Sequence, residues 1–187
     1  PLWCPSLPSQ LTRGDLDQLH SSERGIHIGL IDGIENGAHR CLTWQHGNIL
    51  MSGSGSSTSK LALLARSCAT TLSDSLGFPL CGVSIDSGTE HSSATSPDYL
   101  IRDIVDFGVL CEDLCHRAPC IVWLEDIEGT LHMLEECLGV LRAHDLWGQF
   151  TRSCDGVNIV LIASDVSGRF SSRTLFGSYE HIWYEVP

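Results

Sequence analysis

The chain is short of positive charge. Its 187 residues include 11 Lys and Arg against 23 Asp and Glu, a formal net charge of −12, and Lys60 is the only lysine. A direct grip on nucleic-acid phosphates needs clustered Lys and Arg side chains. We therefore expect no binding of nucleic acid by this domain alone, whereas its acidity suits solubility or a basic partner.

Long apolar runs and paired cysteine motifs are also missing. No apolar run approaches the roughly 18 residues of a membrane span, and no signal peptide precedes the first apolar strand. The nine cysteines are an odd number without a C-x-x-C pair, which disfavours a disulfide framework. Cys111, Cys115 and His116 have helical spacing, but no second ligand pair is evident, so we predict no metal site. We expect reduced thiols, no membrane segment in this part of the chain and a cytoplasmic location.

What is present is an alternation of strands and helices. With 187 residues and 42% hydrophobic content, the chain suits one large domain. Period-2 and period-3.6 apolar patterns predict an α/β fold with a mostly parallel sheet. The predicted strands are 48–52, 80–86, 120–126 and 157–165, and the predicted helices are 61–73, 99–116 and one that carries Leu131, Leu134, Leu138 and Leu141. We divide the single domain, 1–187, into a lead-in at 1–46 and a core of sheet and helices at 47–187.

A loop of small residues follows the first core strand. It consists, with the helix entry, of Gly53, Ser54, Gly55, Ser56, Ser57, Thr58, Ser59 and Lys60. In an intact G-x-x-x-x-G-K-[ST] phosphate loop, backbone N–H groups wrap the phosphates, the Lys reaches the β- and γ-phosphates, and the hydroxyl binds Mg²⁺. Here Thr58 replaces the second glycine, Ser59 the lysine and Lys60 the hydroxyl residue.

These changes predict a reshaped loop. A shift of one residue on a helix rotates a side chain by about 100°, so Lys60 does not simply replace the missing cation. A left-handed backbone at the β-branched Thr58 costs on the order of 1–3 kcal/mol. The free N–H groups of the helix N-terminus still permit weak anion binding. The alternative is an ordinary Ser/Gly-rich turn between a strand and a helix.

Two acids end the strand predicted at 120–126. Glu125 and Asp126 have the position of a Walker B pair, in which the first acid serves Mg²⁺ and the second positions or activates water. The first is usually Asp, so Glu125 is a longer ligand. Acids before a helix also act as caps, and that alternative stays open for both residues.

Polar residues end the strand predicted at 157–165. Ser164 could sense a γ-phosphate, although Asp165 and the residues up to Gly168 could equally form a turn. Arg169 and Arg173 follow, either as fingers toward a neighbouring subunit or as partners of surface acids.

The order of these pieces resembles a known family. The segments PLWCPSLP at 1–8 and IHIGLID at 26–32 are similar to the W-x-P-x-L-P and I-x-I-G-L-x-D lead-in of FtsK/SpoIIIE-type ATPase modules in type VII secretion motors, the EccC and EssC proteins. The spacing from this lead-in to Gly53, to Glu125 and to Ser164 also matches.

The resemblance implies a RecA-like P-loop NTPase fold of three layers, with a nucleotide-pocket remnant between 53–60 and 125–164. It implies one module of a longer, membrane-anchored chain, whose partners are neighbouring ATPase modules, the C-terminal export signal of a secreted substrate and other copies in an oligomeric motor. Because Ser59 stands where the family has Lys, we expect ATP and Mg²⁺ to bind weakly or not at all and hydrolysis to be lost.

Three functions follow as hypotheses. The first is a non-hydrolysing module that contributes interfaces and captures substrate helices in an apolar groove. The second is an active or weakly active ATPase in which Lys60 is recruited by a rearranged loop. The third, a DNA translocase module, conflicts with the acidic composition.

Overall fold

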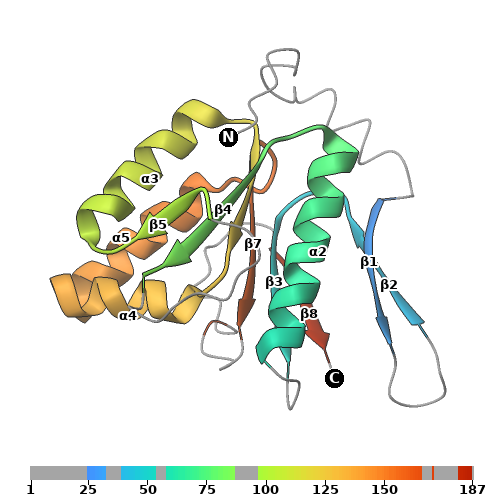
Figure 1. Cartoon of the computed structure of the whole chain (residues 1–187), viewed down its shortest axis with the longest axis horizontal. Coiled ribbons are helices and arrows are strands. Elements are labelled where there is room, and N and C mark those ends of the chain that lie inside the picture. Colours follow the sequence, from blue (N-terminus) through green and yellow to red (C-terminus); the bar gives the residue numbers. More distant parts are fainter. Residues whose placement is uncertain are drawn as a thin grey trace.

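The computed structural model describes residues 25–32, 39–53, 58–86, 97–165, 170 and 181–186. Figure 1 shows the elements along the chain. Their bounds are β1 (Ile26–Asp32), β2 (His39–Trp44), β3 (Asn48–Gly53), α2 (Thr58–Leu76), β4 (Leu80–Ile85), β5 (Tyr99–Ile101), α3 (Ile104–Arg117), β6 (Cys120–Leu124), α4 (Ile127–Leu138), α5 (Val140–Ser153), β7 (Ile159–Asp165) and β8 (His181–Val186).

The main sheet is parallel throughout the part of the chain that the structure describes. Its strands have the order β5-β4-β6-β7-β3-β8, and each neighbouring pair is parallel. The prediction of an α/β fold with a mostly parallel sheet is therefore confirmed. Because all strands run the same way, their carboxyl ends lie along one edge of the sheet.

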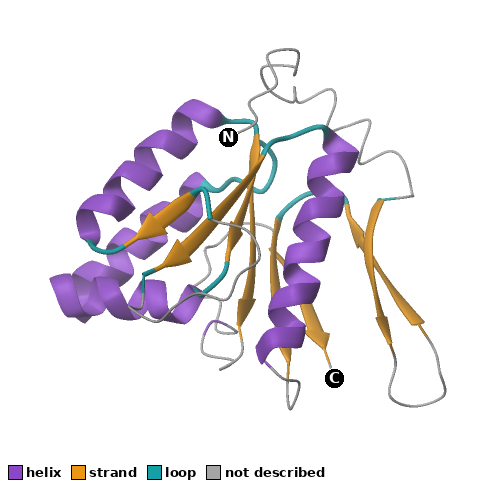
Figure 2. Cartoon of the chain, viewed as in Figure 1, coloured by secondary structure: helices purple, strands orange, loops and turns teal. Residues whose placement is uncertain are grey.

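Helices cover both faces of this sheet, which gives three layers (Figure 2). Successive side chains of a strand point to opposite faces. In β7, Leu161 packs with α3, α4 and α5, whereas Val160 and Ile162 pack with α2. We call these the α3–α5 face and the α2 face. None of the described helices has the length and apolar character needed to cross a membrane.

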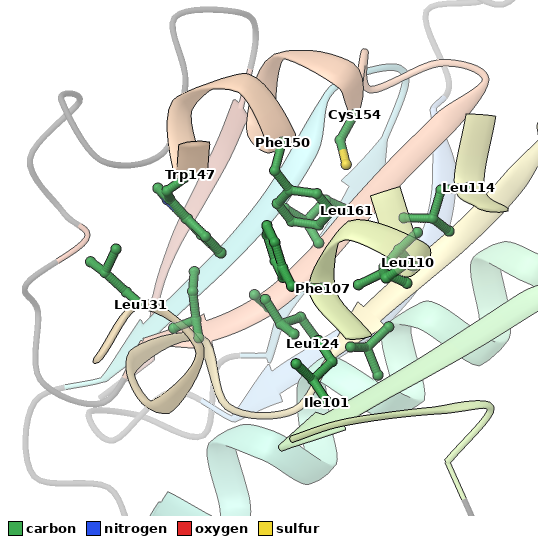
Figure 3. Packing of buried hydrophobic residues seen from close by; sticks show 14 of the residues in the cluster. Ile101, Phe107, Leu110, Leu114, Leu124, Leu131, Trp147, Phe150, Cys154 and Leu161 are labelled. Carbon is green, nitrogen blue, oxygen red and sulfur yellow. The ribbon is translucent and has the colours of Figure 1, made fainter. Parts of the chain in front are cut away.

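The α3–α5 face is filled by large side chains. Trp147 and Phe150 of α5 meet Phe107 of α3 and Phe170, as Figure 3 shows for the first three. The ring centroids lie 5.3 Å apart for Phe107–Phe150, 5.4 Å for Trp147–Phe150 and 5.9 Å for Trp147–Phe170. Tilted and edge-on aromatic pairs of this kind each add about 0.5–1.5 kcal/mol beyond the area they bury. This cluster therefore joins α3 to α5 and α5 to Phe170.

On the α2 face, small residues of the helix meet larger side chains of the sheet and the hairpin, the completely buried Trp44 among them. Ala65, Cys68 and Ala69 of α2 are completely buried, and the antiparallel hairpin of β1 and β2 lies beside this helix (Figure 1). A Cβ added to Gly29 of β1 would lie 3.0 Å from the Cys68 Sγ. Burial also raises the pKa of the Cys68 thiol to about 12. Close approach of the hairpin to α2 thus depends on a glycine opposite a protonated, buried thiol.

The amino ends of β3 and β7 are fixed to each other. The Asn48 Nδ2 donates to the carbonyl of Cys154 at 2.6 Å, and its Oδ1 accepts from the N–H of Leu161 at 2.8 Å. Gly156 has φ +74°, and a Cβ there would lie 2.5 Å from the Cα of Gly47. These contacts set the register of the two strands whose other ends carry the candidate site.

Two predicted helices differ from the structure. The helix predicted at 99–116 begins only at Ile104, because Asp103 has an extended backbone and caps it by accepting from the N–H groups of Val105 at 2.9 Å and Asp106 at 3.0 Å. The preceding residues, Tyr99–Ile101, form β5 instead and pair with β4.

The helix predicted through Leu141 is also interrupted. Gly139, with φ +77°, separates α4 from α5. As a result Leu134 is completely buried, whereas Leu141 lies on the next helix and is 87% exposed.

Candidate functional site

The sheet has a switch point between β3 and β7, which are neighbours. After β3 the chain enters α2 on one face, and after β7 it reaches Phe170, which is buried on the α3–α5 face. In open parallel sheets ligands bind outside the carboxyl ends of two such strands, where the chain departs to opposite faces. The predicted loop and Ser164 both belong to this point.

The structure describes the two ends of the predicted phosphate loop. Gly53 is the last residue of β3, and Thr58 and Ser59 begin α2, with the exposed Lys60 next in its first turn. That turn contains no acidic residue, so its backbone N–H groups and dipole remain favourable to an anion. The four loop residues between them, Ser54, Gly55, Ser56 and Ser57, lie outside the described residues.

A row of three polar side chains crosses the carboxyl edge on the α2 face. In the strand register Val83 of β4 pairs with Leu124 of β6, and Leu124 pairs with Ala163 of β7. The next residue of each strand is polar: Ser84, Glu125 and Ser164. We call these three residues the polar row. Ser84 and Ser164 are both buried.

The Glu125 carboxylate is turned toward one side of the row. The Ser84 hydroxyl donates a hydrogen bond to the Glu125 Oε2, and the Glu125 N–H continues the ladder to the carbonyl of Val83 at 3.0 Å. Because β4 and β7 lie on opposite sides of β6, this bond draws the carboxylate away from Ser164 and from the loop strand β3.

Asp126 is a helix cap. Its Oδ1 accepts a hydrogen bond from the N–H of Gly129 at 2.8 Å, and its backbone carbonyl accepts from the Thr130 hydroxyl at 2.7 Å. A Cβ on Gly129 would lie 2.3 Å from the Asp126 Oδ2, so the side chain lies over this glycine. The capping alternative left open by the sequence therefore describes the position of Asp126.

Asp165 was not assigned a role from the sequence. It is completely buried, and its Oδ2 accepts from the N–H of Phe170 at 2.9 Å. Its backbone is in register with Ser52 of β3, one residue before Gly53. The Asp165 carboxylate therefore joins the end of β7 to Phe170, on the opposite face from Ser164. Ser84 was likewise missed, because a polar residue near the end of an apolar strand was its only signal.

The residues present do not fit a magnesium ion. Mg²⁺ in phosphate-loop sites takes an oxygen from the loop hydroxyl and from the strand-end acid. Lys60, which occupies the hydroxyl position, carries only N–H donors, and the Glu125 carboxylate is turned toward Ser84 of β4. Within the described part of the chain, no three His, Cys, Asp or Glu residues form a group that could hold a metal.

Comparison with known proteins adds no family. No protein-family model and no curated protein matches the chain.

Proposed function

We propose that this chain is a non-hydrolysing, RecA-like module of a type VII protein secretion motor, which acts by binding and assembly. The observation that carries the proposal is the combination at the switch point of an altered phosphate loop with a Walker B-like acid pair whose side chains have other partners. Asp126 caps α4 and Glu125 accepts from Ser84. The chain retains the secondary structure around a nucleotide site and has changed the residues that act on the nucleotide.

The order of the strands supports the RecA-like assignment. The strand entering the loop, β3, and the strand before the acids, β6, flank β7, which ends in Ser164 and Asp165. A nucleotide at the switch point therefore has all three candidate segments within one or two strands. Without a lysine at Ser59, charge that develops on a transferred phosphoryl group lacks a major partner, and losses of this kind raise a barrier by roughly 3–4 kcal/mol per donor.

A titration with labelled ATP and Mg²⁺ tests the nucleotide side of the proposal. We expect a dissociation constant of about 1 mM or weaker for the wild type. The matched control restores the loop letters with Thr58→Gly, Ser59→Lys and Lys60→Ser, and we expect it to bind more tightly. Saturable micromolar binding by the wild type would contradict the proposal.

One observation keeps a weakly active ATPase as a second candidate. The Lys60 side chain is exposed in the first turn of α2 and is therefore free to approach a phosphate if the loop rearranges. In that case the Lys60→Ala variant would lose the ATP binding that the wild type shows. The first proposal predicts instead that this substitution changes the affinity for ATP little.

The binding role is tested with synthetic C-terminal export helices. We propose that neighbouring modules of the same chain and the export signal of a secreted substrate are the partners. A titration of the domain with such a helix is expected to show saturable binding without nucleotide. A scrambled helix of equal composition is the control, and equal binding of both helices would argue against the role.

A further inference from the structure

We infer that Cys81 and Cys120 form a binding site for one thiophilic monovalent cation, Cu(I). The two thiols belong to neighbouring strands, β4 and β6, and lie near the amino ends of those strands. Both are on the α3–α5 face, so this site is separate from the polar row on the α2 face. The inference therefore stands independently of the proposed function.

The two sulfur atoms meet inside the core. The Cys120 thiol donates a hydrogen bond to the Cys81 sulfur. Cys81 is 3% exposed and Cys120 is completely buried, and both belong to the hydrophobic cluster of their face. A single buried cysteine behaves as a small apolar residue. Here two of them place a pair of soft ligand atoms side by side.

The strand register limits what this pair can do. Leu80 of β4 pairs with Ile121 of β6. Cys81 follows the first and Cys120 precedes the second, so the two cysteines are diagonal neighbours. Neighbouring strands lie about 4.8 Å apart and two residues rise about 6.6 Å, which places the Cα atoms of a diagonal pair roughly 8 Å apart. A disulfide needs Cα atoms about 4.4–6.8 Å apart, so the pair suits a bridging ion better than a bond between the sulfurs.

A soft cation between the two sulfurs fits this arrangement. Thiolates select soft ions such as Cu(I), whereas Mg²⁺ and Ca²⁺ prefer oxygen ligands. Cu(I) forms stable complexes with two thiolates in a line, so the pair needs no third ligand, unlike a structural zinc site with its four. Binding releases one proton from each thiol to solvent and leaves a complex with one net negative charge.

Arg117 supplies the opposite charge. A buried charge is costly unless it is paired or hydrogen-bonded. The Arg117 side chain has a hydrogen bond to the Cys81 sulfur, and its guanidinium carbon lies 5.3 Å from the centroid of the Tyr99 ring. The same side chain is 31% exposed. Arg117 therefore links the buried thiol pair to solvent and compensates the charge of the complex.

The test is an anaerobic titration of the fully reduced protein with Cu(I) buffered by the competing chelator bicinchoninate. We expect the wild type to hold one equivalent against the chelator, with a thiolate-to-Cu(I) absorption in the near ultraviolet. Cys81→Ala and Cys120→Ala are each expected to lose this equivalent. Arg117→Gln should weaken it roughly tenfold, the value of one charge-assisted hydrogen bond, whereas Arg117→Lys should keep most of the affinity.

Two control variants make the assignment specific. Cys154→Ala removes another buried thiol of the same face, and the double variant Cys115→Ser, Cys137→Ser removes two exposed thiols. Both controls are expected to keep the tightly held equivalent. Thermal unfolding without metal shows that each variant is folded, and Cys81→Ser and Cys120→Ser replace the alanine variants if those unfold.

Failure of the wild type to retain Cu(I), or retention of the ion by either alanine variant, overturns the inference. Loss of the ion in either control also overturns it, because other thiols would then be required. An unchanged affinity in Arg117→Gln would overturn the role of the guanidinium. None of these results concerns nucleotide or export helices, so the proposed function is tested separately.

Discussion

The two faces of the sheet differ in the side chains that fill them. The α3–α5 face contains Trp147, Phe107 and Phe150 in tilted and edge-on contact, and its carboxylates bond to backbone N–H groups. The α2 face is packed by Trp44 and aliphatic side chains against small residues of α2, and its polar row reaches the edge where the predicted phosphate loop begins. Both faces bury a hydrophobic core, and the polar row lies on the α2 face.

The two adjacent acids show how this difference arises. Asp126 accepts from an N–H of α4 and so belongs to the α3–α5 layer, whereas Glu125 lies in the polar row and accepts from Ser84. Asp126 and Glu125, although adjacent in the sequence, therefore have different structural roles. The comparison predicts that substitutions on the first face change folding, and that substitutions in the polar row change ligand binding.

The largest effect is expected from the aromatic cluster. Trp147 is completely buried, so Trp147→Ala should lower the free energy of unfolding by about 3–5 kcal/mol. Urea denaturation measures the loss. The matched control is Trp123→Ala on the α2 face, where the tryptophan is only partly buried. An equal or larger loss at Trp123 would show that the depth of burial does not set the cost of removing a tryptophan.

A smaller effect is expected where the hairpin meets α2. Gly29→Val places a side chain against the Cys68 Sγ, which lies 3.0 Å from the position of a Cβ. Overpacking of this kind costs about 1–3 kcal/mol. Adding Cys68→Ala should recover part of the loss, because the two residues are in contact. Strictly additive losses in the double variant would show that the thiol does not set the packing distance.

The side-chain cap of α4 at Asp126 is predicted to make its own contribution to the free energy of unfolding. Asp126→Ala should lower the free energy of unfolding by about 1 kcal/mol through the lost bond to Gly129, whereas Asp126→Asn, an equally good cap, should change it by a few tenths. Thermal and urea unfolding of both variants decide the point. If Asn destabilised the protein as much as Ala does, the negative charge and not the cap would account for the residue.

The smallest effect is expected at the corner between α4 and α5. Leu141 is 87% exposed, so Leu141→Ala should change the free energy of unfolding by less than about 0.5 kcal/mol. Leu134→Ala, at a completely buried position of α4, is the control and should cost about 2–5 kcal/mol. Similar losses at the two positions would mean that Leu141 is covered in solution.

Four strands of the core sheet, β3, β4, β6 and β7, were predictable because they are continuous apolar runs bounded by polar residues, whereas β8 (His181–Val186) was not predicted. β5 was not, because three residues give no period of their own and Tyr99–Ile101 continue the helical spacing of α3. The break at Gly139 was hidden for a similar reason, since Leu138 and Leu141 keep a helical interval across it.

The candidate site was predictable only as a set of strand ends. The sequence identified Glu125, Asp126 and Ser164, because parallel strands bring such residues to one edge. The hydrogen bond from Ser84 was not predictable, since it depends on β4 lying beside β6. The order of strands along the chain does not determine which strands are neighbours in the sheet. The sequence offered the helix cap at Asp126 as an alternative to the Walker B role, but it could not decide between the two.

Steady-state phosphate release from ATP in the presence of Mg²⁺ tests the central claim most directly. The account predicts that the wild-type domain releases no more phosphate than a protein-free blank. A steady rate that is lost in Asp126→Asn, a variant that preserves the cap of α4, would contradict it and would identify the domain as a working ATPase.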